Sequence, residues 1–250
     1  KGFLTNFYLD EFKHNIWIHN ESLYYEYVCQ NTCFIIRITD NYWNVFYVTV
    51  GLDTLREALS AFKDMYNENT LIFDVVGRIE QCNAVLPVFY GTGFVDKSSL
   101  VRMIRITEEV PMDGEIEKVQ RASVEQAKYL REMLFRYMDE TVEQIPDWEE
   151  YEHWCKLGHI LIYSINGKIA GFLDFEKNKT TMMPRHWLVL PEYRGCNVGS
   201  ILYRRFLFEA NDVKRTLSWV IRTNDISIKS HHRYGFIEEN MFDYIIVNKQ

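Results

Sequence analysis

The chain has 250 residues, of which 47% are hydrophobic and 15% aromatic, and it carries a net charge of −7 at pH 7. This size allows one large domain or two small ones. The negative charge argues against a nucleic-acid partner, which usually requires a basic face. No apolar run is long enough to span a membrane, and no signal-peptide pattern is present. We therefore expect a cytoplasmic protein without a membrane partner.

The five cysteines are odd in number and scattered along the chain. Cys29 and Cys33 stand four residues apart, but no second pair completes a zinc site. We therefore expect reduced thiols and no bound metal.

The first half of the chain predicts α/β elements of uneven regularity. Strands are expected at residues 34–38, 45–50, 71–76 and 100–106, with a helix at 52–66 and a segment at 86–94 that ends in Gly-Thr-Gly-Phe. Four aromatic residues near the second strand could line a cleft, although a core position fits them better: Tyr42, Trp43, Phe46 and Tyr47.

Residues 107–117 are polar and turn-rich and predict a linker between two domains. A short strand is expected at 116–121. Ser123 and Gln126 form a capping-box signature, and apolar residues follow them at helical spacing as far as Met138. A second helix is expected at 148–156, after Pro146.

The remaining elements alternate in a regular order. Strands at 159–165 and 168–175 are joined by Asn166-Gly167, a strong signal for a type I′ hairpin turn. A strand at 185–190, a helix at 199–210, a strand at 217–222 and a helix at 225–233 follow. Gly235-Phe236 opens a last pair of strands that ends at residues 245–247.

Residues 187–200 predict a strand, a loop of small residues and the start of a helix. We call residues 194–200 the anion loop. Backbone N–H groups in such a loop, with a helix N-terminus behind them, favour a phosphate ligand.

Two segments carry a resemblance to a known family. Residues 188–200 (LVLPEYRGCNVGS) resemble the coenzyme A signature of GCN5-related N-acetyltransferases, and residues 224–236 (NDISIKSHHRYGF) are similar to the second signature of that family. The resemblance implies an α/β (α+β) fold with two such domains, each a mixed, mostly antiparallel central sheet flanked by helices. It further implies that residues 115–250 form the acetyltransferase domain and residues 1–108 a degenerate copy. Gly51-Leu52-Asp53-Thr54 lacks an anion loop, which leaves one active site.

The resemblance also implies which residues hold the coenzyme. The backbone of the strand pairs with the pantetheine arm, and the loop binds the pyrophosphate. Asn224 contacts the pantetheine arm, caps the next helix, or does both. Ser227 faces the coenzyme or packs in the core. The full expected set is Leu188, Val189, Leu190, Arg194, Gly195, Cys196, Asn197, Val198, Gly199, Ser200, Asn224 and Ser227.

Two positions depart from the pattern of the family. Asn197 replaces the middle glycine of the loop, and Asn is the residue other than Gly that best tolerates left-handed backbone geometry. His231 replaces the tyrosine that returns a proton to the coenzyme A thiolate. Histidine can serve as that acid, and we prefer His231 to His232 and Tyr234.

The resemblance places the other catalytic roles near residues 186–190. The backbone N–H of Leu188 or Leu190 would polarise the thioester carbonyl. His186 stands where the family places a general base, with Glu176 and Asp174 as rivals. We discount Cys196 as a nucleophile, because the family uses direct attack by the amine.

The expected function is transfer of an acetyl group from acetyl-coenzyme A to a primary amine of a small molecule or peptide. The alternative is a regulatory module that binds coenzyme A without turnover. A weaker third possibility is transfer of a longer acyl chain. A monomer or a homodimer is expected, with no nucleic-acid partner.

Overall fold

The computed structural model describes residues 2–8, 10–29 and 31–248. The chain divides into two compact units. Unit 1 comprises Lys1–Arg102, Val220–Asp225 and Glu239–Gln250, and unit 2 comprises Met103–Trp219 and Ile226–Glu238. The units are not two consecutive segments, because the end of the chain returns to unit 1. The expected ranges 1–108 and 115–250 therefore stay a prediction, and their outermost residues 1 and 249–250 lie outside the described residues.

Unit 1 holds a sheet with the strand order β2-β3-β4-β5-β12, and β1 pairs with β4. Its strands and helices are β1 (Leu4–Thr5), α1 (Glu11–His19), β2 (Leu23–Val28), β3 (Thr32–Ile38), β4 (Trp43–Thr49), α2 (Leu52–Met65), β5 (Leu71–Gly77), α3 (Ile79–Gly91), most of β6 (Phe94–Ile106) and most of β12 (Ile237–Asn248).

The core of unit 1 is rich in aromatic side chains. Helices α2 and α3 bury apolar residues against β3, β4 and β5, where Phe34, Phe62, Phe73 and Phe89 are fully buried. Tyr47 belongs to this core, so a core position is confirmed for it.

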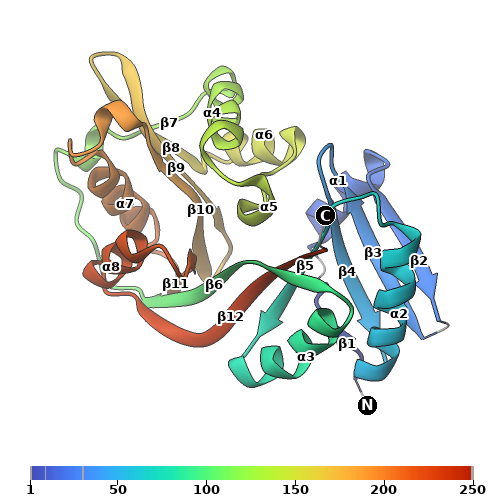
Figure 1. The fold of residues 1–250 in the computed structure, drawn as a ribbon. Helices are drawn as coiled ribbons and strands as arrows, with labels where there is room; N and C mark the ends of the chain where they lie inside the picture. Colours follow the sequence, from blue (N-terminus) through green and yellow to red (C-terminus); the bar gives the residue numbers. More distant parts are fainter. Residues whose placement is uncertain (1, 9, 30, 249–250) are drawn as a thin grey trace. The chain divides into compact units, whose positions relative to one another are not determined.

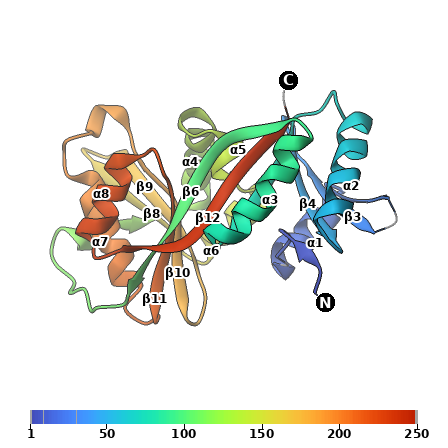
Figure 2. The same ribbon diagram turned by 60° about the horizontal axis from the view of Figure 1, so that its bottom comes forward.

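Unit 2 holds the strand order β11-β10-β9-β8-β7, and the last four residues of β6, Met103–Ile106, precede β11 in this order. Its elements after β6 are η1 (Ile116–Lys118), β7 (Gln120–Arg121), α4 (Val124–Tyr137), α5 (Glu140–Glu143), α6 (Trp148–Lys156), β8 (Ile160–Ile165), β9 (Lys168–Lys177), β10 (Thr181–Val189), η2 (Pro191–Tyr193), α7 (Val198–Glu209), β11 (Arg215–Ile221) and α8 (Asp225–Arg233). Helices α4 and α6 pack on one face of this sheet, whereas α7 and α8 lie side by side (Figures 1 and 2).

Several local predictions for unit 2 are confirmed. The Ser123 side chain accepts from the backbone N–H of Gln126, and the Gln126 side chain accepts from the backbone N–H of Ser123, as a capping box requires. Asn166 and Gly167 have φ angles of 50° and 76°, which a type I′ turn needs. The helices at 148–156 and 225–233 have the predicted bounds.

Strand β10 joins its two neighbours in different ways. It pairs with β9 in antiparallel fashion from Met182 to Val189, but it pairs with β11 only at Thr181 and Met182. Beyond Met182 the two parallel strands therefore separate, and the edge of β10 that faces β11 is no longer paired. This separation leads directly to the anion loop at the end of β10.

Other sequence predictions were wrong. Residues 116–121 form a 3₁₀ turn and a two-residue strand, not one strand. The end of the chain forms one long strand, β12, where we expected a pair, because Gly235-Phe236 opens the strand and no later turn interrupts it. Helix α1, strand β2 and helix α3 were not anticipated.

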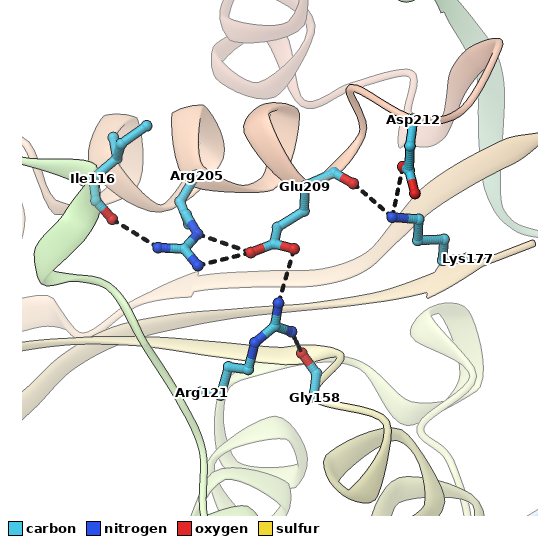
Figure 3. A network of polar contacts seen from close by, with 7 residues as sticks. All are labelled: Ile116, Arg121, Gly158, Lys177, Arg205, Glu209 and Asp212. Carbon is cyan, nitrogen blue, oxygen red and sulfur yellow. Dashed lines mark hydrogen bonds and ion pairs between the residues drawn. The ribbon is translucent and has the colours of Figure 1, made fainter. Parts of the chain in front are cut away.

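The end of the predicted linker packs against α7. Arg205 Nη1 donates to the carbonyl oxygen of Ile116 at 3.2 Å (Figure 3). Arg204 pairs with Asp113. Glu209 then accepts from Arg205 and from Arg121 of β7. This segment is therefore an ordered part of unit 2.

The two halves repeat the same order of elements. The series β3, β4, α2, β5, α3, β6 matches β9, β10, α7, β11, α8, β12. In both series the first two strands are antiparallel and the next pair is parallel and meets at only two residues. Only Val50 and Gly51 separate β4 from α2, whereas residues 190–197 separate β10 from α7. A degenerate first copy remains a prediction that this order favours.

Candidate functional site

The anion loop is shaped by two residues with left-handed backbone geometry. Gly195 has a φ of 84° and Asn197 a φ of 61°, and Asn197 is the N-cap of α7. Glycine adopts this geometry without strain, and Asn is one of the few other residues that do so routinely. The expectation that Asn197 can take the place of the usual glycine is thus met by the backbone.

Backbone N–H groups converge at the start of α7. In the described chain no hydrogen bond from the N–H groups of Gly195, Asn197, Val198, Gly199 and Ser200 to another backbone group was found. Two other loop N–H groups are already used: Arg194 donates to Pro191 O and Cys196 to Tyr193 O, each at 3.3 Å. The open N–H groups and the dipole of a twelve-residue helix suit an anion such as pyrophosphate.

The hydrogen bonds of β10 decide which of its N–H groups are open. Leu190 N–H donates to Ala170 O at 3.0 Å, which makes Val189 and Gly171 a non-hydrogen-bonded pair. Leu188 must then bond to β9, and the N–H and C=O of Val189 point toward β11. The expected carbonyl donors, Leu188 and Leu190, are therefore engaged in the sheet, and Val189 is the donor on the open edge. We missed this alternation because strand register is not visible in a single sequence.

An aromatic layer lies beneath the open edge of β10. The Trp187 ring lies 4.4 Å from the Tyr203 ring, and Tyr203 in turn contacts His231 and Tyr234. A Cβ on Gly199 would come within 3.3 Å of both Trp187 and Val189. The second glycine of the loop therefore leaves room for α7 to pack closely on β10.

His186 is buried and fully engaged. Its Nδ1 lies 2.9 Å from Asp174 Oδ1, and its Nε2 lies 3.1 Å from the backbone oxygen of Glu143. Burial opposes the charged ring, but the Asp174 carboxylate outweighs it and raises the pKa of His186. This arrangement does not support the expected role of His186 as a base, because neither nitrogen can reach an amine.

His231 is also buried, with both ring nitrogens engaged. Nδ1 donates to the backbone oxygen of Ser227 at 2.8 Å, so Nε2 is the acceptor for Ser218 Oγ at 2.9 Å. Burial lowers the pKa of His231 and favours this neutral form. The expected acid therefore has no spare N–H for a thiolate in this arrangement.

The remaining candidates lie as follows. Asn224 is exposed and precedes α8, and Ser227 is half-buried beside His231. Tyr234 donates to Ser200 Oγ at 2.9 Å, which ties α8 to the start of α7. Asp174 is fully buried between His186 and Tyr151, and Glu176 is paired with Arg185 at 3.7 Å. His232 is exposed.

The segment before β8 is strongly acidic. Residues 139–152 contain seven Asp and Glu residues and no Lys or Arg. This segment includes α5, which reaches β10 through the contact between Glu143 and His186. Among the described residues, no group of three or more His, Cys, Asp or Glu side chains could hold a metal ion.

All five cysteines are free thiols. Cys196 is exposed on the anion loop and Cys29 is exposed in unit 1. None of the helices in the described part of the chain is long and apolar enough to cross a membrane.

Comparison with known proteins agrees with this arrangement. Residues 127–236, which hold β8 to β11, the anion loop and α8, match the model of the acetyltransferase (GNAT) family. No curated protein matched the sequence. The match covers the part of unit 2 that carries the candidate site.

Solved structures share the fold over most of the chain. A GCN5-related N-acetyltransferase from Kribbella flavida has a TM-score of 0.62 at 11% identity, covering 95% of this chain and 93% of its own. One from Sphaerobacter thermophilus has a TM-score of 0.61 at 12% identity, with 88% and 80% covered. A tandem GNAT protein from the clavulanic acid biosynthesis pathway has a TM-score of 0.60 at 13% identity, with 87% and 78% covered. The mixed α/β fold, with its mostly antiparallel sheet flanked by helices, is thus confirmed.

Proposed function

We propose that the chain transfers an acetyl group from acetyl-coenzyme A to a primary amine. The observation that carries this proposal is the open edge of β10 leading into the anion loop. The strand edge offers the N–H and C=O of Val189, and the loop offers the N–H groups of Gly195 and of residues 197–200. An extended, amide-containing chain that ends in a pyrophosphate has matching groups in the same order.

The proposed division of roles follows from these contacts. The loop holds the pyrophosphate, and Arg194 adds a positive charge at its exposed entrance. The thioester carbonyl accepts from Val189 N–H, which is fixed before the reaction and stabilises the developing negative charge. Asn224 and Ser227 remain candidates for the pantetheine arm.

The acidic segment 139–152 favours an amine as the acceptor. A primary amine is a cation at neutral pH, and nearby carboxylates attract cations and disfavour anionic acceptors. Small molecules and peptides with a free amine both fit this requirement.

The first test is binding, followed by turnover. Calorimetry of the full chain with acetyl-coenzyme A should show one site, and Gly195→Asp should abolish the heat because it adds a carboxylate to the anion loop. Release of free thiol should then be measured with simple amines, polyamines, amino sugars and lysine-containing peptides. Absence of both heat and thermal shift with acetyl-coenzyme A would refute the proposal.

One observation favours a second candidate function, a module that binds coenzyme A without turnover. Both expected catalytic histidines, His186 and His231, have their ring nitrogens engaged within the protein. Binding of coenzyme A with no thiol release across the whole amine panel would favour this candidate. Competition between acetyl-coenzyme A and longer acyl-coenzyme A thioesters would identify the preferred acyl chain.

A further inference from the structure

His186 faces hydrogen-bond acceptors through both of its ring nitrogens. Nδ1 lies 2.9 and 3.1 Å from the two Asp174 oxygens, and Nε2 lies 3.1 Å from the carbonyl oxygen of Glu143. A neutral imidazole has one N–H, and its other nitrogen would point a lone pair at an acceptor. Only the imidazolium satisfies both neighbours. The ring of His186 therefore already holds both protons and has no position for a third.

The surroundings of this cation are consistent with its charge. Asp174 on β9 also accepts a hydrogen bond from the hydroxyl of Tyr151 on α6, at 3.2 Å. The neighbouring cation is Arg185, which pairs with Glu176 instead. Both side chains of the pair, His186 and Asp174, are completely buried. Such a pair is costly to break, since either partner alone would be an uncompensated buried charge.

The second hydrogen bond of His186 fixes the end of α5. This helix has only four residues, too few to be stable without outside contacts. Asp139 caps its start, and Gln144 leaves it in a left-handed conformation with a φ of 48°. The carbonyl of Glu143 at its last position is thus held at a set distance from β10, and the direction of the Glu143 side chain is constrained with it.

The Glu143 carboxylate is a candidate proton acceptor. The residue is half-buried, and within the described chain no hydrogen bond or ion pair to its carboxylate was found. Burial raises the pKa of Glu143, while the cations His186 and Arg185 oppose that shift and Asp139 and Asp174 add to it. A carboxylate with a pKa above the usual range is a better base near neutral pH.

The position of Glu143 also suits this role. His186 stands three residues before Val189 on the same strand, which is about 10 Å along β10. The backbone oxygen of Glu143 is held at His186, and the length of a glutamate side chain, one bridging water and the amine itself together span a gap of this size to a carbonyl held at Val189 N–H.

We propose that Glu143 takes the proton from the acceptor ammonium, and that the buried Asp174–His186 pair positions Glu143. This inference rests on the proposed function. The neutral amine then attacks the thioester carbonyl, forming the C–N bond. The C–S bond breaks with its electron pair on sulfur, and the sulfur takes the second proton that the nitrogen releases. Glu143 returns its proton to solvent.

The test compares two acceptors that differ in their own charge. n-Butylamine is an ammonium at pH 7, whereas 2,2,2-trifluoroethylamine is mostly neutral and needs no base for its first proton. With butylamine, Glu143→Gln should lower kcat/KM by about 100-fold, the usual contribution of a general base. With trifluoroethylamine the loss should be less than about threefold. Glu132→Gln, an exposed carboxylate on α4, is the matched control and should leave both rates unchanged.

Two results would overturn the inference while leaving the proposed function in place. One is turnover of butylamine by Glu143→Gln at the wild-type rate. The other is an equal loss with both amines, which indicates a structural effect. Coenzyme A binding without thiol release by the wild-type chain across the whole amine panel, these two amines included, would refute both the transfer and this role of Glu143.

A spectroscopic measurement tests the positioning part without any acceptor. In ¹⁵N NMR of the full chain at pH 7, both ring nitrogens of His186 should have the chemical shifts of an imidazolium. Asp174→Asn should remove this signature and, with butylamine, reduce kcat more than it changes KM. A neutral His186 ring in the wild-type chain would contradict the inference.

Discussion

Gly171 on β9 lies so close to Leu188 on β10 that a Cβ on Gly171 would be 2.7 Å from the Leu188 carbonyl oxygen. The same Cβ would be 3.0 Å from Val198, the first residue of α7. The missing side chain therefore allows α7 to pack on the strand pair that carries the anion loop. The position of the loop depends on this contact as much as on its own sequence.

Gly171→Ala should destabilise the protein by about 2–3 kcal/mol, since a backbone oxygen cannot move aside as a side chain can. Urea unfolding measures the change in the free energy of unfolding. Gly114→Ala is the matched control, because nothing lies within 4 Å of its Cβ position. Equal effects of the two substitutions would contradict the close-packing argument.

The left-handed backbone of Asn197 makes a second prediction. Asn197→Ala should raise the free energy of the loop conformation by about 1 kcal/mol, because alanine tolerates a φ of 61° poorly. If this cost appears on binding, the Kd for coenzyme A rises about fivefold. Asn197→Gly, which removes the same side chain without strain, should bind as well as the wild type. Calorimetry separates the two variants, and weaker binding by the glycine variant would indicate that the Asn side chain itself contacts the ligand.

A third prediction concerns Glu209, at the end of α7. It accepts from Arg205 at 2.9 and 2.8 Å and from Arg121 at 2.8 Å (Figure 3). Glu209→Gln leaves two guanidinium groups without their counter-charge, and the Glu209 and Arg205 side chains are only 14% and 15% exposed. We expect a loss of about 1–2 kcal/mol in the free energy of unfolding, greater at low salt.

The control for Glu209 is a second glutamate paired at the same helical spacing. Glu152 pairs with Lys156, whose side chain is 61% exposed. Glu152→Gln should change the free energy of unfolding by less than about 0.5 kcal/mol. An equal loss of unfolding free energy in both variants would contradict the claim that the network at Glu209 stabilises the segment around Ile116.

The sequence predicted the elements whose signals are local. The Asn166-Gly167 turn, the Ser123–Gln126 cap and the left-handed Asn197 depend on one or two residues each, and all three are present. Helix α3 was missed because Pro87 lies within it and its apolar residues extend around most of its surface. The return of β12 to β5 depends on contacts distant in the chain, which no local pattern records.

The roles of the site residues were harder to predict for the same reason. Position along β10 suggested His186 as a base, but its use depends on Asp174 and Glu143, which come from β9 and α5. Glu143 itself carries no motif. Its one sequence signal is the concentration of acidic residues around it, which by itself also fits a solvated surface. To identify Val189, and not Leu188 or Leu190, as the open backbone N–H donor, the register of β10 with β9 had to be known.

The last prediction is a pH dependence of stability that originates at His159. Burial of this ring, together with the nearby cations Lys177 and Arg121, lowers the pKa of His159 to about 4. The unfolded chain binds the proton near pH 6.5 and the folded chain does not, so stability falls as the pH drops from 6.5 to 4. His159 is partly exposed, and we reduce the expected loss to about 1–2 kcal/mol for that reason.

His159→Phe keeps an aromatic ring that can pack on Phe175, 4.8 Å away in the wild type, but this ring cannot titrate. Urea unfolding at pH 4.5 and pH 7 should show a smaller decrease for this variant than for the wild type. The carboxylates and His186 are common to both proteins, so their titration cancels in the difference, and parallel curves would mean that His159 is protonated in the folded state.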